Sequence, residues 1–160
     1  MILLLKNLLF TSLVPGTVAV YIPLLIANKQ SLTSGLFFCA AIIILVLGAG
    51  IYIWCIWDFA IFGRGTPAPI DQPKRLVVRG LYRYTRNPMY VGVLTVILGW
   101  AILFRAVPLL FYAIGVGTVF HLFIVFYEER HLQRKFGDEY NDYRSRTGRW
   151  LPRLRRRRTA

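Results

Sequence analysis

Four long apolar runs, separated by short polar connections, constrain this chain more than any other feature. They cover roughly residues 8–27, 36–62, 89–104 and 106–127. Each run approaches the length of about 20 residues that an α-helix needs to cross a bilayer. Apolar residues fill 56% of the 160 positions, which is too many for an ordinary soluble domain. The sequence therefore predicts a single all-α domain, a polytopic membrane protein with about four transmembrane helices.

The first run follows Lys6 and so resembles the start of a signal peptide. No small-residue cleavage pattern comes after it, and the second run begins within about ten residues, so we expect a retained helix. Pro15 and Pro23 are expected to kink this helix or shorten its ends. A polar loop at residues 28–34 leads to the second run, so residues 1–62 read as an anchoring helical hairpin.

The net charge of +13 is distributed unevenly along the chain. If the N-terminus is cytoplasmic, 18 of the 20 Lys and Arg residues lie inside, and only Lys29 and Arg105 lie outside. This asymmetry follows the positive-inside rule with both termini cytoplasmic, in the inner membrane if the cell is prokaryotic. It also favours contact of the basic tail at residues 153–160 with anionic headgroups over binding to nucleic acid.

The cysteines and histidines do not suggest a metal site. Cys39 and Cys55 both lie in the second run, and sixteen helical residues separate them by about 24 Å, too far for a disulfide. The chain has two His and no Cys-x-x-Cys or His-x-x-x-His spacing, so we predict no bound metal.

Asp58 is an acidic residue near the end of the second apolar run. Trp54 and Trp57 lie beside it, and tryptophans are typical of the interface between membrane and water. We interpret Asp58 as a hydrated residue at the level of the headgroups.

The stretch before the third run combines basic residues with helix-start signals. Asn87 suits the N-cap position and Pro88 the first helical position. The open end of such a helix carries unpaired N–H groups, and with Arg83 and Arg86 nearby it would receive a carboxylate or phosphate. A capped membrane helix with basic residues at the headgroups fits the same pattern.

Two further features belong to the second half of the chain. Gly92 and Gly99 lie seven residues apart on one helix face, which predicts close approach of a neighbouring helix. Arg105 and Pro108 mark a tight turn. The fourth helix ends in Glu128 and Glu129, which would suit a cationic ligand, although Glu129 beside Arg130 is also compatible with an ordinary helix exit.

Residues 132–144 predict a C-terminal amphipathic cytoplasmic helix, bent at Gly137. Leu132, Phe136, Tyr140 and Tyr143 share one face of it. That face would lie on the membrane interface or cover a pocket.

Two blocks of sequence resemble a known family. The first is GLYRYTRNPMYVG at residues 80–92, and the second runs from Glu128-Glu129 through FGDEY at residues 136–140 to Leu151-Pro152. Together they resemble the isoprenylcysteine carboxyl methyltransferases and, more broadly, the membrane methyltransferases that include phospholipid N-methyltransferases. The resemblance covers about half of the chain, roughly residues 74–152.

The resemblance implies S-adenosylmethionine as methyl donor, bound between the start of the third helix and the exit of the fourth. The methionine carboxylate would meet the helix N-terminus near Arg86, and the ammonium would meet Glu128 or Glu129. The sulfonium would lie against the ring of Tyr82 or Tyr90. The expected cofactor-binding residues are Lys74, Arg75, Leu76, Val77, Tyr82, Arg86, Asn87, Pro88, Met89, Tyr90, Glu128 and Glu129.

Two departures from the family pattern concern the methyl acceptor. Asn87 stands where members that methylate prenylcysteine often have His, and Ile124 stands where they carry an arginine. The acceptor therefore stays open between a lipid amine, a prenyl thiol or carboxylate, and another small hydrophobic nucleophile. His121 lies seven residues before Glu128, about 10 Å along the helix, where it would accept a proton from an ammonium nucleophile or bond a neighbouring helix. The candidate catalytic residues are His121, Asn87 and Glu128.

Residues 63–152 are thus expected to form the cofactor-binding and catalytic part. Two other readings remain open at this stage. Sterol-type membrane reductases, which use NADPH, resemble the same C-terminal half. A non-catalytic membrane scaffold whose basic tail gathers anionic lipids fits the charge pattern.

Overall fold

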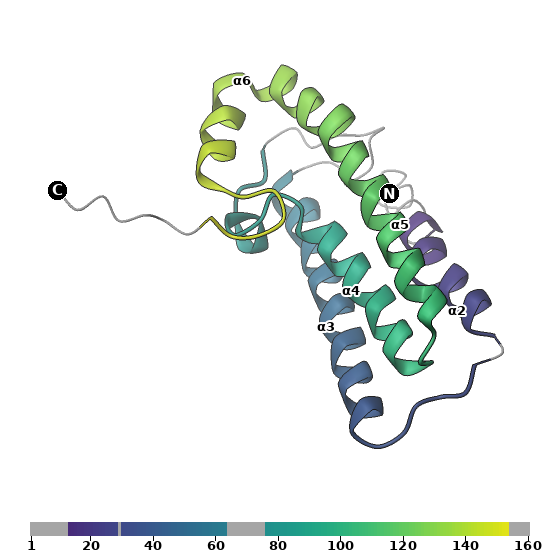
Figure 1. Cartoon of the computed structure of the whole chain (residues 1–160). Helices are drawn as coiled ribbons and strands as arrows, with labels where there is room; N and C mark the ends of the chain where they lie inside the picture. The colour runs from purple at the N-terminus through teal and green to yellow at the C-terminus, as the bar shows by residue number, and fades with distance from the viewer. Residues whose placement is uncertain (1–12, 29, 64–75, 154–160) are drawn as a thin grey trace.

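The computed structural model describes residues 13–28, 30–63 and 76–153, and the regular structure in these ranges is helical (Figure 1). An isolated parallel bridge joins Thr85 to Gly148. Lys74 and Arg75, and the tail beyond residue 153, lie outside the described residues. The prediction of an all-α chain is confirmed within them. The helices are π-helix Thr17–Tyr21, α2 Ile22–Ala27, α3 Leu36–Asp58, π-helix Phe59–Gly63, 3₁₀-helix Gly80–Arg83, α4 Pro88–Leu103, α5 Val107–Phe123, π-helix Ile124–Glu128 and α6 Glu129–Arg146.

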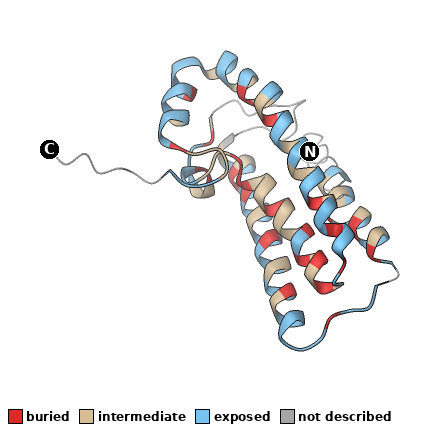
Figure 2. Cartoon of the chain, in the orientation of Figure 1, coloured by how far each residue is buried: buried red, intermediate tan, exposed pale blue. Residues whose placement is uncertain are grey.

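Two of the continuous helices are long and apolar enough to span a membrane. They are Leu36–Phe62 and Val107–Arg146, and the apolar part of the second ends at Tyr127. Only 11% of the most apolar window of each is buried, so neither resembles the core helix of a soluble protein. Figure 2 shows buried residues where helices face one another and exposed residues along the outer faces. The shorter apolar helices Leu13–Ala27 and Pro88–Leu103 pack beside them.

The first helix contains a π-helical turn that has a chemical cause. Ile22 donates its N–H to the carbonyl of Thr17, and Pro23 has no N–H to donate. The carbonyls of Val18 and Ala19 are therefore left without these partners. Tyr112 of α5 donates its hydroxyl to Val18 at 2.9 Å, and Trp100 of α4 donates its indole N–H to Ala19 at 3.0 Å. The irregular turn before Pro23 thus frees two carbonyls whose hydrogen bonds attach this helix to α4 and α5.

Helices α3 and α4 approach closely because glycines face each other across their contact. A Cβ on Gly92 would lie 3.0 Å from the carbonyl oxygen of Gly48, and one on Gly99 would lie 2.8 Å from the side chain of Leu45. This confirms the close-approach face predicted from Gly92 and Gly99. The tight turn expected at residues 105–108 is also present, with Arg105 at φ +50°.

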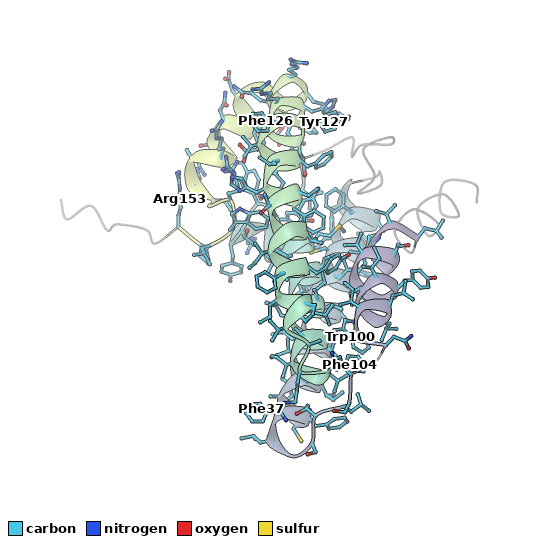
Figure 3. The ribbon with its side chains drawn as sticks, turned by 45° about the vertical axis from the view of Figure 1, so that its right-hand side comes forward. Phe37, Trp100, Phe104, Phe126, Tyr127 and Arg153 are labelled. Atoms are coloured by element: carbon cyan, nitrogen blue, oxygen red, sulfur yellow. The ribbon has the colours of Figure 1, made fainter. Side chains whose placement is uncertain are left out.

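Aromatic side chains lie near both ends of the helix bundle. Phe37, Trp100 and Phe104 lie towards one end, whereas Phe126 and Tyr127 lie towards the other (Figure 3). Phe37, Phe126 and Tyr127 are exposed. This distribution suits an aromatic belt at each membrane surface.

Helix α6 begins without a break from α5 and then turns back on itself. The π-helix Ile124–Glu128 joins the two, and the bend comes at Gly137, whose φ of +52° suits glycine. The expected bend at Gly137 is confirmed, but the expected start of this helix near residue 132 is wrong, because the helix continues from Glu128 into Glu129. The part after the bend returns towards the start of α4 (Figure 1). Tyr140 is only 1% exposed there.

Candidate active site

The start of α4 forms the floor of the candidate site. Asn87 occupies the predicted N-cap position and Pro88 the first turn, but the Asn87 side chain makes no capping hydrogen bond. Its amide instead donates to the carbonyl of Arg149 at 3.0 Å. The expected side-chain cap is therefore wrong, because the bond from Asn87 Nδ2 to a carbonyl of the distant segment after α6 orients the amide away from the capping position. The first N–H groups of α4 are left without a side-chain cap.

The segment at residues 147–150 runs alongside residues 85–87. Thr85 donates its hydroxyl to the carbonyl of Arg149 at 2.9 Å, and the backbone N–H of Arg86 donates to the carbonyl of Gly148 at 2.9 Å. Together with the Thr85–Gly148 bridge, these bonds hold the end of α6 against the start of α4. Two stretches more than sixty residues apart thereby form one wall.

A cluster of ion pairs lies behind that wall. Glu129 contacts Arg86 at 3.0 Å and receives two hydrogen bonds from Arg149, at 2.7 and 3.0 Å. Arg86 also donates to the hydroxyl of Tyr140 at 3.1 Å. Burial alone would raise the pKa of Glu129, but the Arg149 hydrogen bond and the charges of both arginines outweigh it and lower the pKa. Glu129 is therefore an ionised structural anchor.

Arg149 and Tyr140 were not among the residues expected at the site. By sequence alone, Arg149 falls only among the cytoplasmic basic residues, and Tyr140 on the covering face of the last helix. The available signal was position, because both fall inside the second of the two family-like blocks.

Glu128 differs from its neighbour because its carboxylate has no arginine partner among the described contacts. The Tyr90 hydroxyl donates to Glu128 Oε2 at 2.8 Å, and the Tyr90 ring packs against Phe120 with centroids 4.7 Å apart. Burial raises the pKa of Glu128, although the Tyr90 bond partly opposes this rise. The π-helical turn ends at Glu128, so Glu128 meets α4 while Glu129 meets the arginines.

The other side of the α4 start is apolar. Val77 and Tyr82 are buried in a cluster with Cys55, and Met89 packs against it. Tyr143 donates its hydroxyl to the carbonyl of Tyr82 at 2.8 Å, which attaches α6 here as well. Leu76 is half-buried at the edge of the described segment.

The structure thus brings together most of the expected cofactor-binding residues around the α4 N-terminus. They form three groups: the pair of Tyr90 and Glu128, the ionic cluster of Arg86 and Glu129 beside Asn87 and Pro88, and the apolar wall of Val77, Tyr82 and Met89. In the part of the chain that is described, no three His, Cys, Asp or Glu residues gather in a group that could hold a metal.

A family model described as "Phospholipid methyltransferase" matches residues 36–139, about two thirds of the chain. The chain belongs to the phospholipid methyltransferase family. The earlier resemblance is confirmed, and membership implies a membrane methyltransferase. The match includes Tyr90, Glu128 and Glu129 but ends before Arg149. No curated protein and no solved structure matches this chain.

Asp58 is not hydrated at headgroup level, because it is only 5% exposed. Gly80, at φ +56°, lies so close that a Cβ on it would overlap Asp58 Oδ2. The interpretation of Asp58 as a hydrated residue, drawn from its neighbours Trp54 and Trp57, is therefore wrong. The segment at residues 76–83 folds over the end of α3 and covers Asp58, a long-range contact that local composition does not indicate.

The contacts of His121 are with Trp150 rather than with the Tyr90–Glu128 pair. Its Nδ1 accepts a hydrogen bond from the indole N–H of Trp150 at 3.2 Å, and the two rings are stacked with centroids 6.3 Å apart. Sequence reasoning missed Trp150, which directly follows Arg149. The proposed catalytic role of His121 stays a prediction.

Proposed function

We propose that this protein transfers a methyl group from S-adenosylmethionine to a lipophilic acceptor held in the membrane. In this proposal all four apolar helices cross the bilayer and both termini are cytoplasmic. The single observation that carries it is the bond between the Glu128 carboxylate and Tyr90, a residue of the uncapped first turn of α4, in a member of a methyltransferase family. A zwitterionic amino acid group needs both of these partners.

The carboxylate end of such a ligand suits the start of α4. The early N–H groups of that helix have no side-chain cap, and helix N-termini favour anions. Arg86 lies directly before Asn87, and its buried Nε has no hydrogen-bond partner among the described atoms. An anion bound here would accept hydrogen bonds from the early N–H groups of α4 and from Arg86 Nε.

The ammonium end suits Glu128 better than Glu129. Both oxygens of Glu129 already accept hydrogen bonds from Arg149, and Arg86 neutralises it further. Glu128 accepts one bond, from Tyr90, and its half-buried carboxylate gains most from a cation. Of the two glutamates expected to meet the ammonium group, Glu128 is therefore the one we propose.

The chain's own residues then have positioning roles. S-adenosylmethionine supplies an electrophilic methyl group on a sulfonium, so the protein needs mainly to align the reactants and exclude water. The aromatic rings of Tyr90 and Tyr82 are the candidates for contact with the sulfonium. The returning half of α6, held by Tyr143 and the Arg149 segment, covers the site from the cytoplasmic side.

The test is methyl transfer in membranes. Purified protein in nanodiscs made from a total lipid extract would be incubated with tritiated S-adenosylmethionine, and label would be counted in the lipid fraction. We expect transfer that Glu128→Gln abolishes and that the exposed control Glu139→Gln leaves intact. Stronger thermal stabilisation by NADPH than by S-adenosylmethionine would instead support the reductase reading.

A further inference from the structure

A groove of about 370 Å³ lies between α4 and α5, on the outside of the helix bundle. Pockets for small molecules typically occupy about 300–1,000 Å³, so this groove has a useful size. Its apolar part consists of Leu94, Ile114 and Gly117, and Ile114 is 66% exposed. Position 117 is glycine, and a Cβ there would be in van der Waals contact with the methyl groups of Leu94 at 3.7 Å, so a longer side chain would occupy the groove.

One end of the groove is polar. His121 and Trp150 line it, and the Trp150 indole donates to His121 Nδ1. A neutral imidazole that accepts a hydrogen bond at Nδ1 carries its proton at Nε2. His121 therefore presents an N–H donor at the end of an apolar groove. Thr118, the other polar residue of the lining, already donates its hydroxyl to the Ile114 carbonyl.

The residues at the polar end are sequence neighbours of residues in the proposed active site. Phe120, next to His121, packs on Tyr90, which in turn donates to Glu128. Trp150 follows Arg149, which binds Glu129. The polar end of the groove is therefore formed by the sequence neighbours of Phe120 and Arg149, the residues that contact Tyr90 and Glu129.

We propose that this groove holds one hydrocarbon chain of the methyl acceptor, with an oxygen of the acceptor's headgroup hydrogen-bonded to His121 Nε2–H. The occupant is an amphiphile, since the groove is apolar along α4 and α5 and has its donor only at one end. His121 acts as a positioning residue that brings the headgroup to the cofactor. This inference rests on the proposed function, because it gives the acceptor of that reaction its place.

The groove can be filled without touching the cofactor site. Gly117→Leu places a side chain in the groove, whereas Gly115→Leu on the same helix is the matched control, because a Cβ there meets nothing within 4 Å. The probe is a phosphatidylethanolamine that carries a diazirine on one acyl chain, at low mole fraction in nanodiscs. After photolysis, labelled peptides are quantified by mass spectrometry.

We expect label concentrated on the α4 and α5 peptides that line the groove. Gly117→Leu should reduce the amount of label on these peptides roughly three- to tenfold, the effect expected from the loss of one hydrogen bond or of a few apolar contacts. Gly115→Leu should not reduce it. His121→Phe should reduce label as well, whereas His121→Gln, which keeps an N–H donor, should retain it. Loss in both His121 variants would overturn the donor role.

The outcome separates this inference from the function on which it rests. Each variant is also titrated with S-adenosylhomocysteine, and all four should bind it like wild type. Normal binding together with label spread evenly around the helices, or unchanged by Gly117→Leu, would overturn the groove proposal alone. Absence of S-adenosylhomocysteine binding in wild type would instead overturn the proposed function.

Discussion

The two adjacent glutamates should respond in opposite ways to the same isosteric change. Glu129→Gln removes the only acidic partner that the described structure gives to Arg86 and Arg149 and leaves two cations facing each other. Glu128→Gln removes a half-buried charge but keeps a carbonyl oxygen to accept the hydrogen bond from the Tyr90 hydroxyl. We therefore expect the first change to destabilise the fold and the second to leave its stability intact.

The size of the difference follows from burial. The side chains of Glu129 and Arg86 are each 9% exposed and that of Arg149 is 28% exposed. Removing one member of a buried ion pair costs about 3–5 kcal/mol. Because Arg149 is partly hydrated and glutamine still accepts one hydrogen bond, we expect Glu129→Gln to cost about 2–3 kcal/mol of unfolding free energy. Glu128→Gln should stay within about 0.5 kcal/mol of wild type, or exceed it.

The assay is chemical unfolding in mixed detergent micelles, followed by circular dichroism at several pH values. Because the folded-state pKa of Glu129 is lowered, its contribution is present above the ordinary carboxyl pKa of 4.5 and is lost as pH falls through the lower folded value. The gap between wild type and Glu129→Gln should therefore close in acid. Equal losses in both variants, or a Glu129→Gln protein as stable as wild type at pH 7, would refute the assignment of Glu129 as the anchor.

Three other outcomes follow from the structure. Gly92→Ala should cost about 1–3 kcal/mol of unfolding free energy, because its Cβ would press on the backbone of α3. Gly50→Ala, with open space around it, should be neutral or slightly stabilising. Chemical unfolding of the two variants tests this, and equal effects would contradict it. Gly80→Ala should cost about 1–2 kcal/mol or more, because alanine is strained at the positive φ of this position. Asp58→Ala should partly rescue it by removing the carboxylate that the new Cβ would overlap. Additive losses in a double-mutant cycle would count against this contact. Affinity for S-adenosylhomocysteine should fall on acidification at a pH above the ordinary carboxyl range, because the pKa of Glu128 is raised and only its ionised form attracts the ammonium; calorimetry across pH measures this, and an affinity that rises in acid would exclude Glu128 as the partner.

The helices were predictable because their signals are local. Apolar runs gave the four main helices, and Asn87-Pro88 marked the start of α4 to the residue. The spacing of the glycines on α4 predicted a close helix contact, because a glycine lets any neighbouring helix approach its backbone; the structure places α3 there. Gly137 predicted the bend in α6 for the same reason: only its local conformational freedom was needed.

The side-chain partners in the site were less predictable because they depend on segments far apart in the chain. Eleven basic residues follow Glu129, and charge alone does not select Arg149 as the one that folds back. The Asn87 amide turns to the Arg149 carbonyl only because residues 147–150 lie beside it. The π-helical turn before Glu129, which directs the two glutamates to different partners, has no evident sequence signal.

The central claim, that Glu128 and the start of α4 bind the amino acid end of the cofactor, is tested most directly by calorimetric titration of S-adenosylhomocysteine. Detergent-purified wild type would be compared with Glu128→Gln, with the circular dichroism of each recorded beforehand to establish folding. We predict saturable binding by wild type and none, or a large loss of affinity, in the equally folded variant. Equal affinity in both proteins, or no binding by wild type in detergent and again in nanodiscs, would contradict the account.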